Sequence, residues 1–253
     1  MRRKDVPDGK VIIIIEESKM VKDELVQRSP IRVFMNSIHG GLGPGELGLI
    51  ASPSGIGKTS VLVQIALDKL LQGKKVIHIS FTQHTDYVLS WYAHIFDEFI
   101  RKKNLENEED VKNDIVKNRV LMKFNQEGLS VDQILKSLRA LIRDGGFNAE
   151  SVIIDGFDFS LATEEHIAAF KAFAAEMGVS VWYSCTVMGA EPLYDKRNIP
   201  LLLKGCADLF EAIIVLDQKP EYIALTVSRD RDAYSPEHLA LKLDPKTLLI
   251  LEN

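Results

Sequence analysis

The stretch IASPSGIGKTSVLVQIA, residues 50–66, places a glycine-bearing turn between an apolar run and a second segment rich in apolar residues. The run Glu46–Ala51 follows the turn-forming residues GGLGPG, so we expect a strand that leaves a tight loop. Beyond the turn, the apolar residues of Thr59–Leu71 recur at helical spacing, and Gly73 ends the pattern. The stretch therefore predicts a strand, a loop and a helix in succession.

The same alternation continues along the chain. We expect strands at Lys75–Phe81, Val120–Phe124, Ser151–Ile154 and Val179–Ser184, and helices at Leu129–Ile142, N-capped by Ser130, and at Glu164–Met177. Strands that alternate with helices predict an α/β fold whose mostly parallel sheet is flanked by helices.

The last third of the chain has a different pattern. Four apolar runs follow one another through short polar turns that leave no room for helices: Ala212–Leu216, Tyr222–Val227, Leu239–Leu243 and Leu248–Leu251. We expect antiparallel strands that extend the sheet. The charge-dense segment Phe96–Asn118 is typical of solvated helical surface.

Composition limits the class of protein. The 253 residues are 46% hydrophobic, which is enough for one soluble domain. The net charge of −5 and the pI near 5.7 argue against a broad basic face. Cys185 and Cys206 are too few for a disulfide framework or a zinc ribbon, which favours a reducing, cytoplasmic setting. No apolar run approaches the roughly 20 residues of a membrane span, and the N-terminus does not have the pattern of an export signal.

The turn SPSGIGKT, Ser52–Thr59, carries the chemistry. Successive backbone N–H groups in a glycine-rich turn at a helix N-terminus form a site for phosphate groups. Lys58 is positioned to reach the β- and γ-phosphates, and the Thr59 hydroxyl to bind Mg²⁺. The binding residues we assign are Ser52, Pro53, Ser54, Gly55, Ile56, Gly57, Lys58, Thr59 and Ser60.

Two features bear on this assignment. The full pattern has glycine at its first position, where this chain has Ser52, and an ordinary strand-to-helix turn is the alternative. About a hundred residues later an apolar strand ends in Asp155, where a carboxylate that organises Mg²⁺ is needed. We therefore expect Thr59 and Asp155 to hold the metal together.

Three segments resemble the RecA-like ATPases, in particular the ATPase domain of DnaB-type replicative helicases and the KaiC-like proteins. They are GGLGPGELGLIASPSGIGKT at 40–59, SVIIDGF at 151–157 and YDKRNIPLLLKGCADLFEAIIVL at 194–216. The resemblance runs from about Val33 to Leu251. It implies a RecA-like ATP-binding domain at 31–253 behind an N-terminal extension at 1–30, ATP with Mg²⁺, and assembly into a homo-oligomeric ring or filament.

Departures from the family pattern concern hydrolysis. The family's catalytic glutamate position aligns with Thr82, followed by Gln83, and neither side chain accepts a proton. His84 and Asp86 are the nearby alternatives. The family's polar sensor aligns with Cys185. Because losing a general base typically costs about 10²- to 10⁴-fold in rate, we expect tight ATP binding with weak hydrolysis.

TVSRDRDA followed by LALKLD resembles the place where the family presents basic residues to a neighbouring subunit's γ-phosphate. Arg229 and Arg231 lie two apart, so on one strand they would project to one face. We assign Arg229 and Arg231 as fingers of this kind, and the catalytic residues are then Lys58, Asp155, Arg229 and Arg231. The alternative is a charged strand edge neutralised by Asp230 and Asp232. The family's glycine after the pair is Ala233 here.

Single-stranded DNA is not favoured as a partner. The loop Met188–Pro200 places Lys196 and Arg197 near Tyr194, with Lys204 further on, whereas such binding normally uses several stacking rings along a positive groove. The sequence therefore predicts an ATP-binding protein that acts through nucleotide-dependent assembly or partner control. The alternatives are a DNA-stimulated ATPase of the helicase type and, more remotely, a kinase. The β-branched run Val11–Ile15 is a strand candidate that we expect to help assembly.

Overall fold

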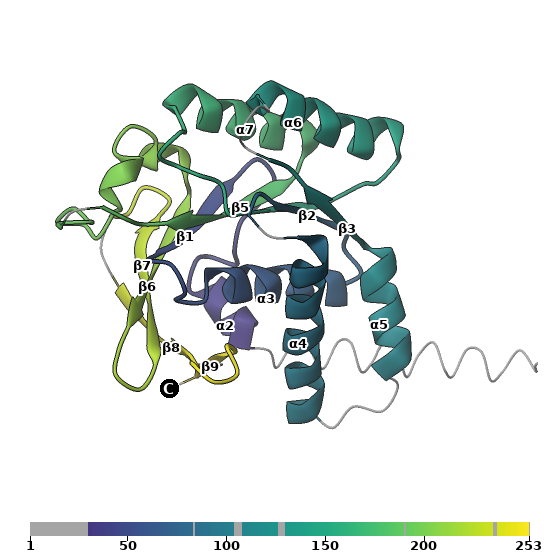
Figure 1. The fold of residues 1–253 in the computed structure, drawn as a ribbon, viewed down its shortest axis with the longest axis horizontal. Helices are drawn as coiled ribbons and strands as arrows, with labels where there is room; N and C mark the ends of the chain where they lie inside the picture. The colour runs from purple at the N-terminus through teal and green to yellow at the C-terminus, as the bar shows by residue number, and fades with distance from the viewer. Residues whose placement is uncertain are drawn as a thin grey trace, which may run out of the picture.

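The computed structural model describes residues 30–82, 84–103, 108–125, 130–189, 191–234 and 237–252. The expected extension lies outside these ranges except for Pro30, and Val11–Ile15 and Gln83 lie outside them too. One nine-stranded sheet carries helices on both faces (Figure 1). Its strands are β1 (Leu47–Ser52), β2 (Val76–Ser80), β3 (Arg119–Lys123), β4 (Ser151–Asp155), β5 (Ser180–Thr186), β6 (Ala212–Gln218), β7 (Ile223–Asp230), β8 (Glu237–Leu243) and β9 (Ile250–Glu252).

The strand order is β3-β2-β4-β5-β1-β6-β7-β8-β9. Neighbouring strands are parallel from β3 to β6 and antiparallel from β6 to β9, which confirms the mostly parallel α/β sheet with antiparallel C-terminal strands. The expectation that β6 is antiparallel like the strands after it is wrong on one side, because β6 pairs parallel with β1. The connection at 187–211 is long enough for the crossover that a parallel pairing needs.

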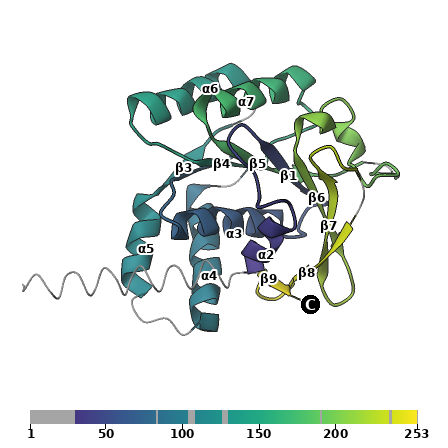
Figure 2. The same cartoon turned by 180° about the vertical axis from the view of Figure 1, so that it is seen from behind.

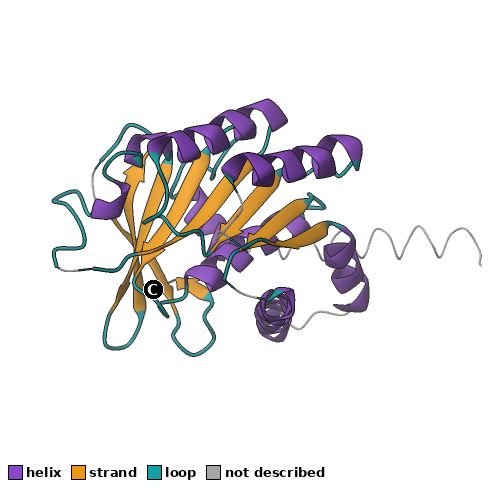
Figure 3. Ribbon diagram, turned by 45° about the horizontal axis from the view of Figure 1, so that its top comes forward, coloured by secondary structure: helices purple, strands orange, loops and turns teal. Residues whose placement is uncertain are grey.

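The helices form a layer on each face of the sheet. Helices α6 and α7 cover one face, and α2, α3 and α4 lie on the other (Figures 1 and 2). Their bounds are α2 (Pro30–Asn36), α3 (Lys58–Leu71), α4 (Thr85–Lys103), α5 (Glu108–Lys117), α6 (Val131–Arg139) and α7 (Glu164–Met177), with a π-helical turn at Ala140–Asp144 and 3-10 turns at Leu201–Leu203 and Ala207–Leu209. Figure 3 shows the strands running between the two layers.

Local chemistry explains why these elements begin and end where they do. All six residues of β1 are buried, as expected for a strand covered on both faces. Ser130 caps α6 and Thr163 caps α7, each through a reciprocal capping box. Gly178 ends α7 with φ 66°, a backbone conformation that favours glycine. The N-cap predicted at Ser130 and the predicted bounds of α7 are therefore confirmed.

The segment Phe96–Asn118 differs from its expectation. It contains the second half of α4 and all of α5, and Phe96, Val111 and Ile115 are buried in the core on the α3 face of the sheet. In the sequence these apolar side chains stand between charged ones. The high charge of the segment therefore obscures the apolar helix face that packs on the core. The start of α4 at Thr85 and the whole of α2 were not expected. In the described ranges, no helix combines the length and apolar character needed to cross a bilayer.

Candidate functional site

The turn after β1 has the geometry expected of a phosphate-binding loop. Gly55 and Gly57 have φ 81° and 101°, which favour glycine, and α3 begins directly at Lys58. A Cβ at Gly57 would also lie 2.5 Å from Leu243 Cδ2, so the side chain of Leu243 in β8 leaves no room for a larger residue at this position. The strand, turn and helix place the helix N-terminus at the carboxyl edge of the sheet, where open α/β sheets bind ligands.

Lys58 is held at the entrance of this turn. Its Nζ donates to the carbonyl oxygens of Pro53 at 2.8 Å and Ser52 at 3.1 Å, and lies 3.3 Å from Ser52 Oγ. Burial lowers the pKa of Lys58, and the nearby Cys185 thiol and Asp155 carboxylate act in the opposite direction. Ser52, in place of the usual glycine, thus supplies one of the contacts that hold the lysine.

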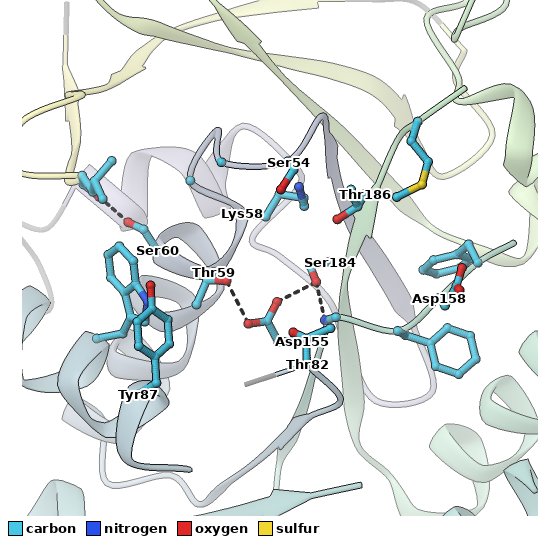
Figure 4. Close-up of a pocket in the computed structure, with 18 residues that line it drawn as sticks. Ser54, Lys58, Thr59, Ser60, Thr82, Tyr87, Asp155, Asp158, Ser184 and Thr186 are labelled. Atoms are coloured by element: carbon cyan, nitrogen blue, oxygen red, sulfur yellow. Dashed lines mark hydrogen bonds between the residues drawn. The ribbon is translucent and has the colours of Figure 1, made fainter. Parts of the chain in front are cut away.

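The carboxylate of Asp155 faces the first turn of α3 across the end of the sheet (Figure 4). Thr59 Oγ1 donates to Asp155 Oδ2 at 2.9 Å, and Ser184 Oγ donates to Asp155 Oδ1 at 2.6 Å. Ser184 Oγ also accepts the Gly156 backbone N–H at 2.7 Å. Thr59 and Asp155 are therefore brought together as predicted, and Ser184 is a third member that sequence reasoning missed.

This group of oxygen atoms fits a magnesium ion bound with phosphates. Mg²⁺ in phosphate-binding sites takes one or two protein oxygens and completes its shell with water and phosphate oxygens. Thr59 Oγ1 and the Asp155 carboxylate are oxygen donors of that kind. Within the described ranges there is no cluster of three or more His, Cys, Asp or Glu side chains that would hold a metal without a phosphate.

These groups open onto a cavity of about 520 Å³ at the carboxyl ends of β1, β4 and β5. The turn after β1 forms one wall, the segment after Asp155 another, and Tyr87 and Trp91 of α4 a third. In Figure 4, Tyr87 lies on one side of the Thr59–Asp155 pair and Asp158 on the other. The volume is within the range of small-molecule sites.

The remaining loop residues do not all face this cavity. Ser54, Gly55, Gly57 and Ser60 line it, whereas Pro53 and Ile56 line a second cavity of about 510 Å³ on the other side of the loop. Ser60 Oγ donates to the Leu248 carbonyl, which also accepts from Gln64 Nε2 at 3.0 Å. Leu248 has φ 56° and belongs to a turn, so the strand expected at Leu248–Leu251 begins later, at Ile250.

Thr82 lines the cavity at the position aligned with a catalytic base. Its Oγ1 would lie 2.5 Å from a Cβ at Gly156, so it packs over the backbone next to Asp155. His84 and Asp86 do not line the cavity, although both are among the described residues. The second carboxylate on the cavity wall is instead Asp158, which accepts hydrogen bonds from the backbone and hydroxyl of Ser160.

The structure corrects the expectation that Cys185 occupies the polar position at the end of β5. Cys185 is fully buried in the core beneath α6 and α7, and burial raises the pKa of its thiol to about 12. Alternation along β5 turns Ser184 and Thr186 toward the cavity instead. The polar side chain at the end of this strand is therefore Thr186, one residue further along the chain.

The arginine pair is arranged differently from the expectation. Arg229 is buried in β7, but β7 ends at Asp230 and Arg231 lies in the following turn with φ 52°. The expectation that both project from one face of a strand is therefore wrong, because the chain leaves the sheet between them. The alternative, a charged strand edge neutralised by neighbouring acids, describes part of what Arg231 does: its Nη1 donates to Asp230 Oδ1 at 2.8 Å.

Arg229 is engaged within the chain. Its Nη1 donates to Asp208 Oδ1 at 2.8 Å, and its guanidinium lies 4.4 Å from the ring centroid of Tyr234. The guanidinium of Arg197 lies 4.3 Å from the same centroid. Arg197 also forms an ion pair with Asp195. Arg197 is thus already paired within this loop, and both Arg197 and Lys196 are exposed to solvent.

Comparisons with models of protein families and with curated proteins found no match to this chain. The functional argument therefore rests on the geometry at the carboxyl edge of the sheet.

Proposed function

We propose that this chain binds ATP with Mg²⁺ at the cavity above β1, β4 and β5, as a RecA-like ATPase with weak hydrolysis. In this proposal nucleotide occupancy controls assembly of the chain or its hold on a partner. The observation that carries it is the group formed by Lys58, Thr59, Asp155 and Ser184. An ordinary strand-to-helix turn gives no reason for a buried lysine at the helix N-terminus and a buried carboxylate bonded to the next residue, Thr59.

Each residue of the group has a task in binding. The backbone N–H groups of the loop and the N-terminus of α3 favour the negative charge of the phosphates. Lys58 would leave the carbonyls of Ser52 and Pro53 and contact the β- and γ-phosphates. Thr59 and Asp155 would hold Mg²⁺, with Ser184 orienting the carboxylate. The bound Mg²⁺ would supply charge stabilisation at the phosphates.

The residues of the cavity wall support weak hydrolysis. Thr82 cannot accept a proton from water. Because Asp155 is assigned to Mg²⁺, Asp158 is the other carboxylate on the cavity wall that could act as a general base. In Figure 4 Asp158 lies apart from the Thr59–Asp155 pair, on the side of Thr186. A poorly placed base supports slow turnover rather than none.

Arg229 and Arg231 connect the proposed nucleotide site to assembly of the chain. Asp230 pairs with Ala212, which is opposite Gly48, so Arg229 and Arg231 lie near the amino end of β1. The phosphate loop follows the carboxyl end of the same strand. Within one subunit these guanidinium groups therefore lie at the wrong end of the sheet for its own phosphates. A finger role would require a neighbouring subunit, and Arg231 is the better candidate because Arg229 is buried against Asp208 and Tyr234.

The test is ATP binding and turnover with purified protein, with and without single-stranded DNA. Lys58→Ala should abolish ATP binding, and Asp155→Asn should weaken the Mg²⁺-dependent part. Lys117→Ala, at an exposed position of α5, is the matched control and should bind normally. Unchanged affinity in both site variants would refute the phosphate-loop assignment.

The DNA arm addresses the helicase-type alternative. The second cavity is lined by Pro53 and Ile56 of the phosphate loop and by Glu191, Leu193 and Tyr194 of the loop that carries Lys196. A strand bound to that loop would therefore act next to the phosphate site. Stimulation of turnover by single-stranded DNA, lost in Lys196→Ala, would favour this alternative over the partner-control proposal.

A further inference from the structure

A separate cavity of about 490 Å³ lies between α4 and α5, next to the edge strand β3 (Figure 1). None of its lining residues lines the cavity at the carboxyl ends of β1, β4 and β5. The wall formed by α4 consists of four residues at helical spacing, Leu89, Tyr92, Ala93 and Phe96. The α5 wall includes Ile115 and Val116. The volume is within the range of small-molecule sites.

Apolar side chains stand at the rim and on the floor of this cavity. Leu89 of α4 is 40% exposed and Val116 of α5 is 61% exposed. Between the two helices Tyr92 and Phe96 are only 2% and 4% exposed, so they form an aromatic floor. An exposed apolar rim over a buried aromatic floor is typical of a surface that a ligand covers.

Arg119, the first residue of β3, brings one positive charge to this apolar cavity. Its guanidinium is half-buried and lies 4.2 Å from the ring centroid of Tyr92. Burial lowers the pKa of Arg119, and Tyr92 acts in the opposite direction. The side chain is nevertheless a cation at neutral pH, because arginine keeps its proton in proteins.

This cation has no anion beside it. Across the described parts of the chain, the side chain of Arg119 forms no ion pair and no hydrogen bond. Glu109 stands on the α5 wall but is exposed and does not pair with it. Lys112, another cation on the same wall, pairs with Asp97 at 3.3 Å. A guanidinium that is partly removed from water therefore keeps its N–H donors available inside the cavity.

We infer that this cavity binds a small amphipathic carboxylate, an acid with an aliphatic or aromatic body, whose two oxygen atoms accept hydrogen bonds from Arg119. The planar fork of an arginine matches a carboxylate through two parallel N–H···O bonds. The apolar body would lie on Tyr92 and Phe96 and cover Leu89 and Val116. The inference is independent of the proposed nucleotide site, since the two cavities share no residue.

The alternative occupant is a helix of another protein that presents an aspartate or glutamate to Arg119. The stem of such a side chain is short, so it would bring peptide backbone against the apolar walls. A free acid brings only its apolar body to them. The position of the single unpaired cation beside an aromatic floor therefore favours the small acid.

Octanoate and its neutral counterpart octanamide are the probes, and calorimetry with the full chain measures their binding. Octanoate should bind at least about 10-fold more tightly than octanamide, because hydrogen bonds to a charged group contribute more than neutral ones. Butyrate has four fewer methylene groups and should bind on the order of 100-fold more weakly than octanoate, since each buried methylene adds to the affinity.

Variants of the cation test the role of Arg119. Arg119→Leu should remove the preference for octanoate and leave octanamide binding nearly unchanged. Arg119→Lys keeps the charge but not the fork, so it should retain part of the preference. Arg143→Leu, at an exposed arginine outside this cavity, is the matched control. Circular dichroism and thermal unfolding check that each variant is folded, and Arg119→Lys decides the matter if Arg119→Leu is not.

A second pair of variants tests the apolar wall. Val116→Glu should weaken the binding of octanoate and octanamide alike, because it places a carboxylate where the apolar body lies. Leu161→Glu, at a leucine of similar exposure outside this cavity, should leave both unchanged.

Four results would each overturn the inference. They are equal binding of octanoate and octanamide to the wild-type chain, a full preference for octanoate in both Arg119 variants, octanoate binding that Val116→Glu does not change, and no binding of octanoate at millimolar concentration. The last result would leave a helix of another protein as the occupant of the cavity.

Discussion

At the scale of single residues, the hydroxyl groups of Thr59 and Ser184 orient the carboxylate of Asp155. Ser184 also holds the backbone N–H of Gly156, so it fixes both the side chain and the turn that follows it. Groups that orient a metal ligand typically contribute about 10- to 100-fold to metal affinity. Ser184→Ala should therefore weaken Mg²⁺-dependent ATP binding by about that factor, as measured by calorimetry at varied Mg²⁺. Ser180→Ala, in the same strand but bonded to Ser151, should change it little.

Thr82 allows a direct test of the missing base. Thr82→Glu places a proton acceptor on the cavity wall beside Asp155 and should raise ATP turnover by about 10- to 100-fold. Thr82→Gln has nearly the same size but accepts no proton, so it should not raise the rate. A wild-type rate in the usual helicase range, or equal rates in both variants, would contradict the argument.

His78 makes stability depend on pH. It is buried in β2, its Nδ1 lies 3.1 Å from the Tyr92 hydroxyl, and its Nε2 has no hydrogen-bond partner within the described ranges. Burial lowers the pKa of His78 from 6.5 to about 4. Between these values the unfolded chain binds a proton that the folded chain does not, so stability falls as pH falls through this window. The full contribution is about 3 kcal/mol.

Urea unfolding at about pH 7 and about pH 5 measures this effect. His78→Leu should lose stability less steeply on acidification than the wild type, whatever its stability at neutral pH. His84→Leu, at an exposed site, should keep the wild-type slope. Parallel slopes for all three proteins would show that His78 is not the group responsible.

The tight turn at Ser52–Thr59 was predictable from sequence because its conformation is set by local backbone geometry around Gly55 and Gly57. Ser184 and Thr186 were not, since their role depends on which face of β5 turns toward α3. A shift of one residue in alignment exchanges the two faces of a strand, which is why Cys185 was assigned in place of its neighbour. Asp158 and Tyr87 carry no local motif, and only the cavity reveals them.

At the scale of elements, stacking on the ring of Tyr234 links β7 to the neighbouring turns. The ring of Tyr234 contacts Arg229 and Arg197, and the Tyr234 hydroxyl donates to Asp208. Arg229→Ala should lower the free energy of unfolding by about 1–2 kcal/mol, because it removes a buried guanidinium from the ring and from Asp208. Arg229→Lys, which keeps the charge but not the planar stacking group, should recover only part of the loss. Thermal unfolding of the purified variants measures both.

The same distinction between local and distant determinants applies to the elements. The helix bounds of α7 and the cap of α6 follow from nearby residues, Thr163, Gly178 and Ser130, and were predictable. The direction of β6 was not, because it depends on how the 187–211 connection crosses the sheet. The start of α4 at Thr85 was missed: its first turn, Thr85–Val88, buries only Val88 and places Tyr87 on the cavity wall.

For the whole molecule, assembly is the property that separates the two readings of Arg231. Its side chain is 36% exposed at the amino end of the sheet, bonded to Asp230. If it serves a neighbour's phosphates, Arg231→Ala should preserve oligomers formed without nucleotide and abolish their tightening by Mg-ATP. Light scattering with and without Mg-ATP measures this, with Arg143→Ala, at a more exposed arginine on the α6 side, as control. A chain that stays monomeric at high concentration in both conditions would leave Arg231 as a turn residue that pairs with its own acids.

The position of β1 in the middle of the sheet has a consequence for synthesis of the chain. Leu47–Ser52 pairs with Ser180–Thr186 on one side and with Ala212–Gln218 on the other, and no nearer strand stands beside it. A chain that leaves the ribosome N-terminus first therefore carries β1 without either neighbour until most of its length has been translated. Loops of this length make pairing slow, since their closure must precede the contacts that compensate for it. During that interval the apolar residues of β1 lack both strands that cover them in the folded sheet, so this segment is exposed to association with other chains.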